Sequence, residues 1–125
     1  MGRRLGCTAF FICTTVLGVD RYVVRDGPTI SPYDTWDKAA SNIQIAVDAA
    51  VTGETVWVSN GVYSVDSMIE VRKDIRLVGY GGAAATVIDG RGTHGCFLLE
   101  GRVGLDGFTV TNGNAVAGSG IEVQW

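Results

Sequence analysis

The sequence predicts an all-β fold: a parallel β-helix with three short strands in each coil, preceded by one amphipathic capping helix. Two observations lead to this prediction. Short apolar runs alternate with turns that carry many of the 18 glycines, in a chain of 125 residues that is 46% hydrophobic. Beyond residue 53 these runs recur in a fixed order. Many short strands favour an all-β domain, and repetition of a unit of about 20–50 residues favours a solenoid.

The repeating unit contains three classes of strand. Successive copies of a class are 23 to 29 residues apart. The copies are Val58–Gly61, Val87–Gly90 and Val110–Gly113 in one class, Ile69–Val71, Phe97–Leu99 and Ile121–Val123 in the second, and Ile75–Leu77 and Val103–Leu105 in the third. A strand of three or four residues is unstable alone, but it gains backbone hydrogen bonds when it stacks on its copy about 4.8 Å away.

Alternate residues of each strand are expected to point into the centre of the coils and form the core. This inward set is Val56, Val58, Ile69, Val71, Ile75, Leu77, Val87, Phe97, Leu99, Val103, Leu105, Phe108, Val110, Ile121 and Val123. The outward set, which suits a solvated wall, includes Ser59, Glu70, Arg76, Thr111 and Glu122. Burial of each inward side chain is worth about 1.5–3 kcal/mol.

The alternative to a solenoid is a β-sandwich or a β-meander. Asn-Gly and Asp-Gly pairs, which occur at several of the turns, are also strong signals for β-hairpins. The repeated unit argues against this alternative, because it contains three strands rather than two. A sandwich also has no reason to repeat a unit of this length.

One helix is predicted in front of the first coil. Arg21–Arg25 is predicted as a short strand, and residues 26–33, which hold both prolines, as a loop. The helix follows, with Asp34 or Thr35 as its cap and Gly53 at its end. Its apolar face is formed by Trp36, Ala40, Ile43, Val47 and Ala50. Such a face can cover the apolar end of the first coil, which a solenoid requires.

The N-terminus has the pattern of a secretory signal peptide over residues 1–18. Arg3 and Arg4 precede an uncharged apolar stretch, and Val16 and Gly18 occupy the −3 and −1 positions of a cleavage site. The alternative is a buried N-terminal helix or strand. Cleavage would remove two of the 10 basic residues and leave eight against 13 acidic ones, a net charge of −5. The acidic balance argues against a nucleic-acid partner, and no transmembrane helix is expected in the mature chain.

The predicted organisation is a signal peptide at 1–18, a strand, loop and capping helix at 19–53, and the first two to three coils at 54–125. Cleavage leaves Cys96 as the only cysteine, and its apolar neighbours predict a small core residue. The third coil is incomplete at Trp125. We therefore expect the same β-helix to continue beyond Trp125, unless the chain is a truncated product.

Four motifs follow one another between residues 21 and 63: Tyr22–Val23, Pro32–Tyr33 with Trp36, the helical segment Ala39–Val47, and Gly53–Val56. In this order they resemble the N-terminal cap and first coil of bacterial surface proteins with right-handed parallel β-helices, in the pectin-lyase-like superfamily. Gly107–Val123 also resembles the repeat of polymorphic outer-membrane proteins, although Ser119 interrupts its paired glycines. The resemblance implies bacterial export, to a secreted, cell-surface or outer-membrane location, and a polysaccharide or cell-surface component as partner.

The same superfamily contains enzymes. Its polysaccharide lyases use calcium-binding carboxylates and an arginine base, and its hydrolases use clustered aspartates and a His-Gly motif. Glu70 and Glu122 share an outward column about 9.6 Å apart, near the separation found in inverting glycosidases. Leu98 is expected between them, which leaves no groove for a water molecule. A solvated wall is the favoured interpretation of this pair.

The other polar candidates favour structural roles. Asp89 and Asp106 are expected at corners, and His94, the only histidine, in an exposed loop. Arg72–Asp74 is expected to be a solvated turn, and Gly79–Gly82 lacks the lysine and helix of a phosphate-binding loop. No Cys/His cluster has metal-ligand spacing. Catalytic residues and metal ligands are thus unknown and no cofactor is expected; a lyase-like activity would imply calcium.

Two functions follow as hypotheses. The first is an exported, non-catalytic β-helix segment that serves surface display, adhesion or glycan contact. The second is the N-terminal part of a polysaccharide lyase or glycoside hydrolase whose active site lies beyond residue 125. Under either hypothesis we expect the 125-residue chain to show no turnover of polygalacturonate.

Overall fold

The computed structural model describes residues 19–92 and 94–113, together with the backbone of 121–124. The predicted signal peptide at 1–18 lies outside these residues. One α-helix, α1 (Ile43–Ala49), and a short 3₁₀ helix, η2 (Trp36–Lys38), precede most of the strands. The strands are β2 (Arg21–Val23), β3 (Thr55–Val58), β4 (Gly61–Ser64), β5 (Ile69–Val71), β6 (Arg76–Gly79), β7 (Thr86–Asp89), β8 (Phe97–Glu100), β9 (Gly104–Asp106), β10 (Thr109–Thr111) and β11 (Ile121–Gln124).

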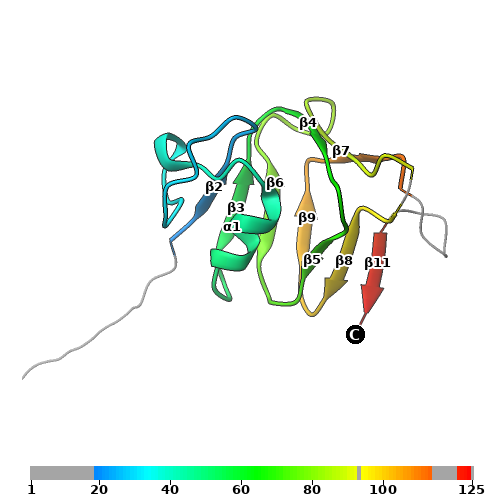
Figure 1. Cartoon of the computed structure of the whole chain (residues 1–125). Helices are drawn as coiled ribbons and strands as arrows, with labels where there is room; N and C mark the ends of the chain where they lie inside the picture. The colour runs from blue at the N-terminus through cyan, green and yellow to red at the C-terminus, as the bar shows by residue number, and fades with distance from the viewer. Residues whose placement is uncertain (1–18, 93, 114–120, 125) are drawn as a thin grey trace, which may run out of the picture.

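The strands form three parallel sheets (Figure 1). The first sheet has the order β2-β3-β6-β9, the second β4-β7-β10 and the third β5-β8-β11. From β3 to β11 the chain visits the first, second and third sheets in turn, three times over. Each strand therefore pairs with the strand three places away along the chain. This arrangement confirms a mostly β-stranded chain of parallel sheets with one N-terminal α-helix.

The register confirms two of the three predicted strand classes. Phe97 pairs with Ile69 on one side and Ile121 on the other, and Leu77 pairs with Leu105. These pairs are the ones that the sequence repeats predicted. The prediction succeeds because the alternation of inward apolar and outward polar residues defines the register of a strand.

The class formed by Val58–Gly61, Val87–Gly90 and Val110–Gly113 is wrong. Val58 pairs with Gly79 in the first sheet, whereas Val87 pairs with Val62 in the second. Val110 lies opposite Ile88, one residue away from its predicted partner. The error has a physical cause. An Asn-Gly or Asp-Gly pair favours a turn but does not specify which strands the turn connects.

The core lies between the three sheets, and most of its members are those predicted. Fully buried side chains include those of Val56, Val58, Val71, Leu77 and Phe97. The predicted inward residues Val103, Leu105, Phe108 and Val110 are partly buried against this core. The side chains of Ile121 and Val123 lie outside the described part of the chain.

Val87 is a correction to the predicted core. It is only partly buried, and its neighbours Thr86 and Ile88 are the fully buried residues of β7. The alternation in β7 is therefore shifted by one residue from the prediction. Thr86 is the polar member of the pair, and its Oγ1 is buried without a hydrogen-bond partner among the described residues.

The predicted helix begins later than expected. Ala40 accepts a hydrogen bond from Val24 N and donates one to Tyr22 O, both at 2.9 Å. A residue held in extended pairing with β2 cannot also belong to a helix. Asn42 is therefore the cap: its Oδ1 accepts from the backbone N–H groups of Gln44 and Ile45. Neither Asp34 nor Thr35 caps α1.

The short helix still has the predicted amphipathic character. Ile43, Ala46 and Val47 are buried, and α1 packs against β2, β3 and β5 (Figure 1). Trp36, predicted on the buried face, lies in η2 and is 38% exposed. None of the helices within the described ranges is long and apolar enough to cross a membrane.

Candidate functional site

The glutamate column of the third sheet has the predicted register. Glu70 lies opposite Leu98, and Leu98 lies opposite Glu122. Leu98 is buried, and the Glu70 carboxylate is held by the guanidinium of Arg72 at 2.9 Å. The side chain of Glu122 lies outside the described residues. Glu70 therefore forms part of a surface ion pair, with a buried leucine beside it on the next strand.

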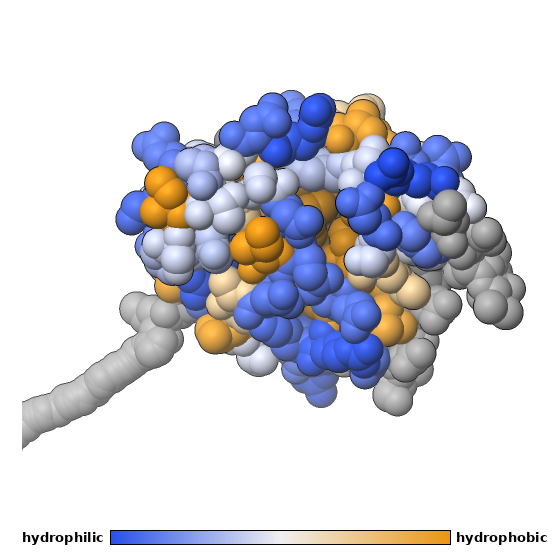
Figure 2. Space-filling view, viewed as in Figure 1, coloured by the Kyte–Doolittle hydropathy of each residue, from blue (hydrophilic) through white to orange (hydrophobic). Residues whose placement is uncertain are grey.

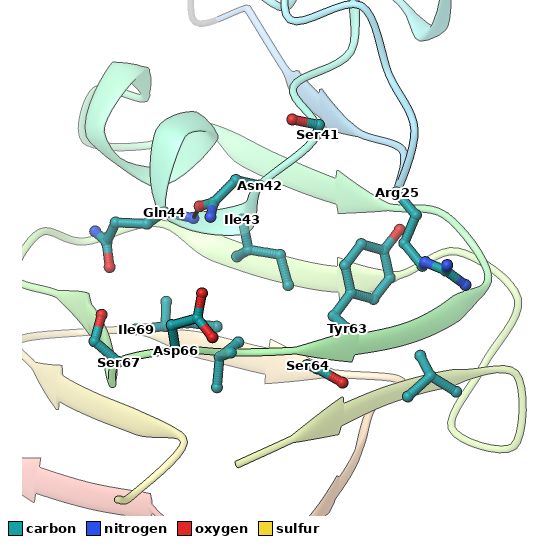
Figure 3. Close-up of a pocket in the computed structure, with 12 residues that line it drawn as sticks. Arg25, Ser41, Asn42, Ile43, Gln44, Tyr63, Ser64, Asp66, Ser67 and Ile69 are labelled. Carbon is teal, nitrogen blue, oxygen red and sulfur yellow. Dashed lines mark hydrogen bonds between the residues drawn. The ribbon is translucent and has the colours of Figure 1, made fainter. Parts of the chain in front are cut away.

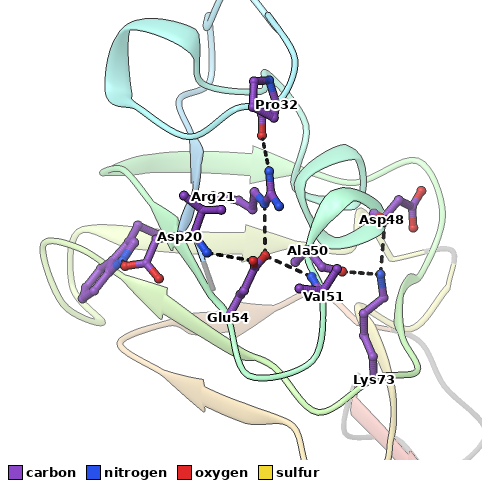
Figure 4. Close-up of polar contacts among 10 residues, drawn as sticks. Asp20, Arg21, Pro32, Asp48, Ala50, Val51, Glu54 and Lys73 are labelled. Atoms are coloured by element: carbon purple, nitrogen blue, oxygen red, sulfur yellow. Dashed lines mark hydrogen bonds and ion pairs between the residues drawn. The ribbon is translucent and has the colours of Figure 1, made fainter. Parts of the chain in front are cut away.

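The charged turn at residues 72–74 is more than a solvated loop. Arg72 donates hydrogen bonds to both Glu70 and Glu100, and the hydrogen bond that Glu70 accepts, followed by the charge of Glu100, raises the pKa of the guanidinium. Lys73 Nζ donates to the carbonyls of Ala50 at 2.7 Å and Asp48 at 3.2 Å, at the C-terminal end of α1 (Figure 4). A cation at a helix C-terminus is favourable because it meets unpaired carbonyls.

The Asp89 carboxylate closes a turn, as predicted for a corner residue. Asp89 Oδ1 accepts from the backbone N–H of Arg91 at 2.9 Å and from Asn112 Nδ2 at 3.0 Å. These hydrogen bonds, the one from Arg91 first, hold the pKa of Asp89 below its usual value. Asp106 ends β9 and is exposed, with its carboxylate 4.0 Å from Arg76 Nη2.

His94 and Cys96 lie just before β8. His94 is partly buried, not exposed as predicted, and its Nδ1 is 2.8 Å from the carbonyl oxygen of Gly95. Cys96 is fully buried, which confirms its role as a small core residue. Burial raises the pKa of its thiol, so the sulfur stays protonated near neutral pH. Among the described residues, no group of three or more His, Cys, Asp or Glu side chains could hold a metal ion.

A buried ion pair fastens the N-terminal elements together. Glu54 Oε1 accepts from Arg21 Nε at 3.1 Å and from Val51 N at 3.0 Å, and its Oε2 accepts from Val19 N at 2.8 Å (Figure 4). Arg21 Nη1 donates to Pro32 O at 2.8 Å. The two side chains are only 10% and 2% exposed. Because every contact of this pair joins backbone segments before β3, its role is structural.

Four aromatic side chains, Tyr22, Trp36, Trp57 and Tyr80, form a surface feature that the sequence analysis missed. We name it the aromatic wall. Tyr22 lies opposite Trp57 in the register of β2 and β3, on the outward side of the first sheet. The ring centroids are 4.6 Å apart for Tyr22 and Trp36, 5.4 Å for Trp36 and Tyr80, and 6.2 Å for Trp57 and Tyr80.

The aromatic wall is accessible from solvent. Tyr80 is 67% exposed, and Trp36 is also exposed. Trp57 Nε1 donates to Asp20 Oδ2 at 2.9 Å, which orients the indole. The sequence did contain a signal for this feature. Tyr22 and Trp57 each precede an inward valine, and because side chains alternate along a strand, both rings face outward.

A second feature is a groove of about 350 Å³ beside β4, which we name the β4 groove. One side is formed by Ser41, Asn42, Ile43 and Gln44, and the other by β4 and the residues that follow it (Figure 3). Figure 2 shows it as a hollow between α1 and β4 with a hydrophilic rim. The lining residues are Arg25, Ser41, Asn42, Ile43, Gln44, Val62, Tyr63, Ser64, Val65, Asp66, Ser67 and Ile69.

Most polar side chains around the β4 groove are small or uncharged, and its floor includes Ile43, Tyr63 and Ile69. Tyr63 is buried; its hydroxyl donates to Ser59 O at 3.0 Å, and burial raises its pKa. A neutral phenol fixed in this way is a wall of the groove and not a general base. The groove is suited to binding and lacks the convergent acid and base that hydrolysis requires.

Comparison of the chain with protein-family models, with curated proteins and with solved structures gave no match. Function is therefore inferred from the arrangement of the strands and from the two surface features described above.

Proposed function

We propose that this chain forms an exported right-handed parallel β-helix of the pectin-lyase-like kind, and that it contacts glycans without cleaving them. The observation that carries the proposal is the aromatic wall on the outer side of a stack of parallel strands. The order of the strands supports the proposed fold, and the exposed aromatic rings support the proposed contact with glycans.

The strand order supports a β-helix because three consecutive strands, one from each sheet, would make one coil. β3, β4 and β5 would be the first coil, β6, β7 and β8 the second, and β9, β10 and β11 the third. A connection between parallel strands of one sheet is nearly always right-handed. α1 and β2 would then act as the terminal cap that a solenoid requires. Among the described residues, β9, β10 and β11 are the last strands of the three sheets.

The aromatic wall supports glycan contact. The face of an aromatic ring is electron-rich and attracts weakly positive hydrogens. A pyranose presents such hydrogens on its C–H faces, so it can stack on exposed rings such as those of Tyr80 and Trp36. Arg76 and Asp106 lie on the same side of the first sheet and offer hydrogen-bond partners to sugar hydroxyls. Since these two charges balance, the ligand class that fits best is a neutral polysaccharide.

The candidate catalytic residues support a role without catalysis. Glu70 is in an ion pair with Arg72, and Asp89 accepts two hydrogen bonds within its turn. These side chains already have structural partners. If residues of this chain formed a lyase active site, incubation with polygalacturonate and calcium would release unsaturated product, and we expect none.

Glycan contact is tested by measuring binding to neutral polysaccharides. Tryptophan fluorescence reports binding to soluble polysaccharides, and pull-down reports binding to insoluble ones. We expect binding, and we expect Trp36→Ala and Tyr80→Ala each to weaken it at least tenfold. Val51→Ala is the control, because it removes an exposed apolar side chain that is not part of the aromatic wall. Binding that is indifferent to both aromatic substitutions, or no binding to any polysaccharide, would refute the proposal.

Export is tested separately. We expect the protein recovered from outside expressing cells to begin at Val19, as N-terminal sequencing would report. A mature protein that retains Met1 and stays within the cell would contradict export while leaving glycan binding open to its own test.

A further inference from the structure

We propose that the β4 groove binds an extended polypeptide segment, which adds to the free edge of β4 as a parallel strand and places an acidic side chain near Arg25. This inference goes beyond glycan contact and does not depend on it. It rests on a comparison of how the three sheets begin.

The first and third sheets have covered starting edges. In the first sheet, β2 pairs with β3 along Arg21–Val23. In the third sheet the side chain of Gln44 takes the place of a strand on β5. Its Oε1 accepts from Glu70 N at 2.8 Å, and its Nε2 donates to Glu70 O at 3.0 Å. A carboxamide carries the same donor and acceptor as a peptide group, so it can satisfy one residue of a strand edge.

The second sheet begins with an open edge. β4 is its terminal strand, and within the described residues no strand or side chain bonds to the outer edge of β4. The backbone N–H groups of Gly61 and Val65 donate toward the β7 side, to Ala85 O and Asp89 O. Peptide groups alternate in direction along a strand. The N–H and C=O groups of Val62 and Ser64 therefore point away from β7, into the β4 groove.

The groove occupies the place that a preceding strand would take. It lies between β4 and residues 41–44, which turn away into α1 instead of pairing with β4 (Figure 3). The four residues of β4 span about 13 Å, and a partner strand would lie about 4.8 Å from them. Exposed strand edges of this kind recruit extended peptides, with main-chain hydrogen bonds supplying much of the affinity. Parallel addition is expected because every strand pair in the three sheets is parallel.

Charge at the two ends of the groove selects the peptide. Asp66, at the far end, already pairs with Arg91. Arg25 lies beside the start of β4, is exposed, and takes part in no ion pair among the described residues. A parallel peptide would bring its first residue to this end. An acidic first residue would then meet Arg25, which distinguishes this occupant from a neutral or basic peptide.

The test uses the acetylated and amidated peptide Glu-Thr-Val-Thr-Val and the isotope-labelled chain in solution. We expect the backbone amide signals of Val62 and Ser64 to shift on titration and to become protected from hydrogen exchange. Arg25→Glu should weaken binding about tenfold. Arg102→Glu is the matched charge control, because Arg102 is exposed and does not line the groove.

Two further probes decide the mode of binding. A peptide with N-methyl groups at every backbone nitrogen cannot donate hydrogen bonds to β4 and should not bind, and a peptide that begins with Lys should bind at least tenfold more weakly. Equal binding of the N-methylated peptide would overturn strand addition. Unchanged Val62 and Ser64 signals at millimolar peptide would overturn it too, as would a polysaccharide that shifts these signals when the peptide does not.

Discussion

The N-terminal side of the strand stack, next to β2 and β3, buries its leucines better than the opposite side, at β9 and β10. Leu77 and Leu105 are directly paired in neighbouring strands of the first sheet and point inward together. Leu77, which has β3 on its other side, is fully buried, whereas Leu105 is only partly buried. The difference shows that a short strand hides its apolar side chains only where other elements cover it on both sides.

The N-terminal side gains its cover from polar contacts as much as from apolar ones. α1 contributes a small apolar face, and the segments around it are joined by Arg21–Glu54, Gln44–Glu70 and Lys73 with the end of α1. No comparable buried ion pair occurs near β9 and β10 within the described residues. Substitutions on the two sides should therefore lower the free energy of unfolding by different amounts.

The largest effect is expected from Glu54→Ala. Removal of one partner leaves the buried Arg21 guanidinium without its counter-ion, which typically costs about 3–5 kcal/mol. The free energy of unfolding, measured by denaturant titration with tryptophan fluorescence, should fall by this amount. Asp106→Ala removes an exposed carboxylate in a weak pair and should change stability by less than about 0.5 kcal/mol. Equal losses from the two substitutions would contradict the contrast between the sides.

The paired leucines provide the most direct comparison. Leu77→Ala should cost about 3 kcal/mol, because it leaves a cavity in a fully packed region. Leu105→Ala should cost about 1 kcal/mol, because the methyl groups that it removes are partly hydrated already. The same denaturant titration measures both. If Leu105→Ala proved as costly as Leu77→Ala, the region around β9 would have to be covered in solution.

A smaller effect is expected from Gln44→Ala, which opens the edge of β5. The two lost hydrogen bonds to Glu70 are exposed to solvent, so water replaces them in part and the loss should be about 1 kcal/mol. Gln44→Glu keeps the acceptor and loses the donor, and it should lie between the wild type and Gln44→Ala. Hydrogen exchange at Glu70 N should accelerate in Gln44→Ala; an unchanged rate would mean that Gln44 does not cover the edge.

The smallest effect concerns pH. The folded chain holds the pKa of Asp89 below its ordinary value, so the carboxylate stabilises the fold above the unfolded pKa of about 4. This contribution is lost as the pH falls through the lower folded pKa. Asp89→Asn should therefore reduce stability slightly at pH 6 and leave it unchanged at pH 2, in denaturant titrations at the two pH values. A larger loss at pH 2 than at pH 6 would reverse the predicted sign.

The sequence alone determined β6 and β9 of the first sheet, the three strands of the third sheet, and much of the core. Ile69 and Phe97, or Leu77 and Leu105, could be matched because alternation of inward and outward residues is a local property of each strand. The same local reasoning places Tyr22 and Trp57 on the outside. It also identified Cys96 as a core residue from its apolar neighbours.

Only the tertiary structure decided the start of α1 and the openness of the β4 groove. α1 cannot begin before Asn42 because Ala40 pairs with β2, some 18 residues earlier. Gln44 covers β5 through a contact 26 residues away, and no group in the described part of the chain does the same for β4 near Val62. Such contacts join distant segments through the path of the chain in space. A pattern of neighbouring residues records which way each side chain points, but not which distant group it meets.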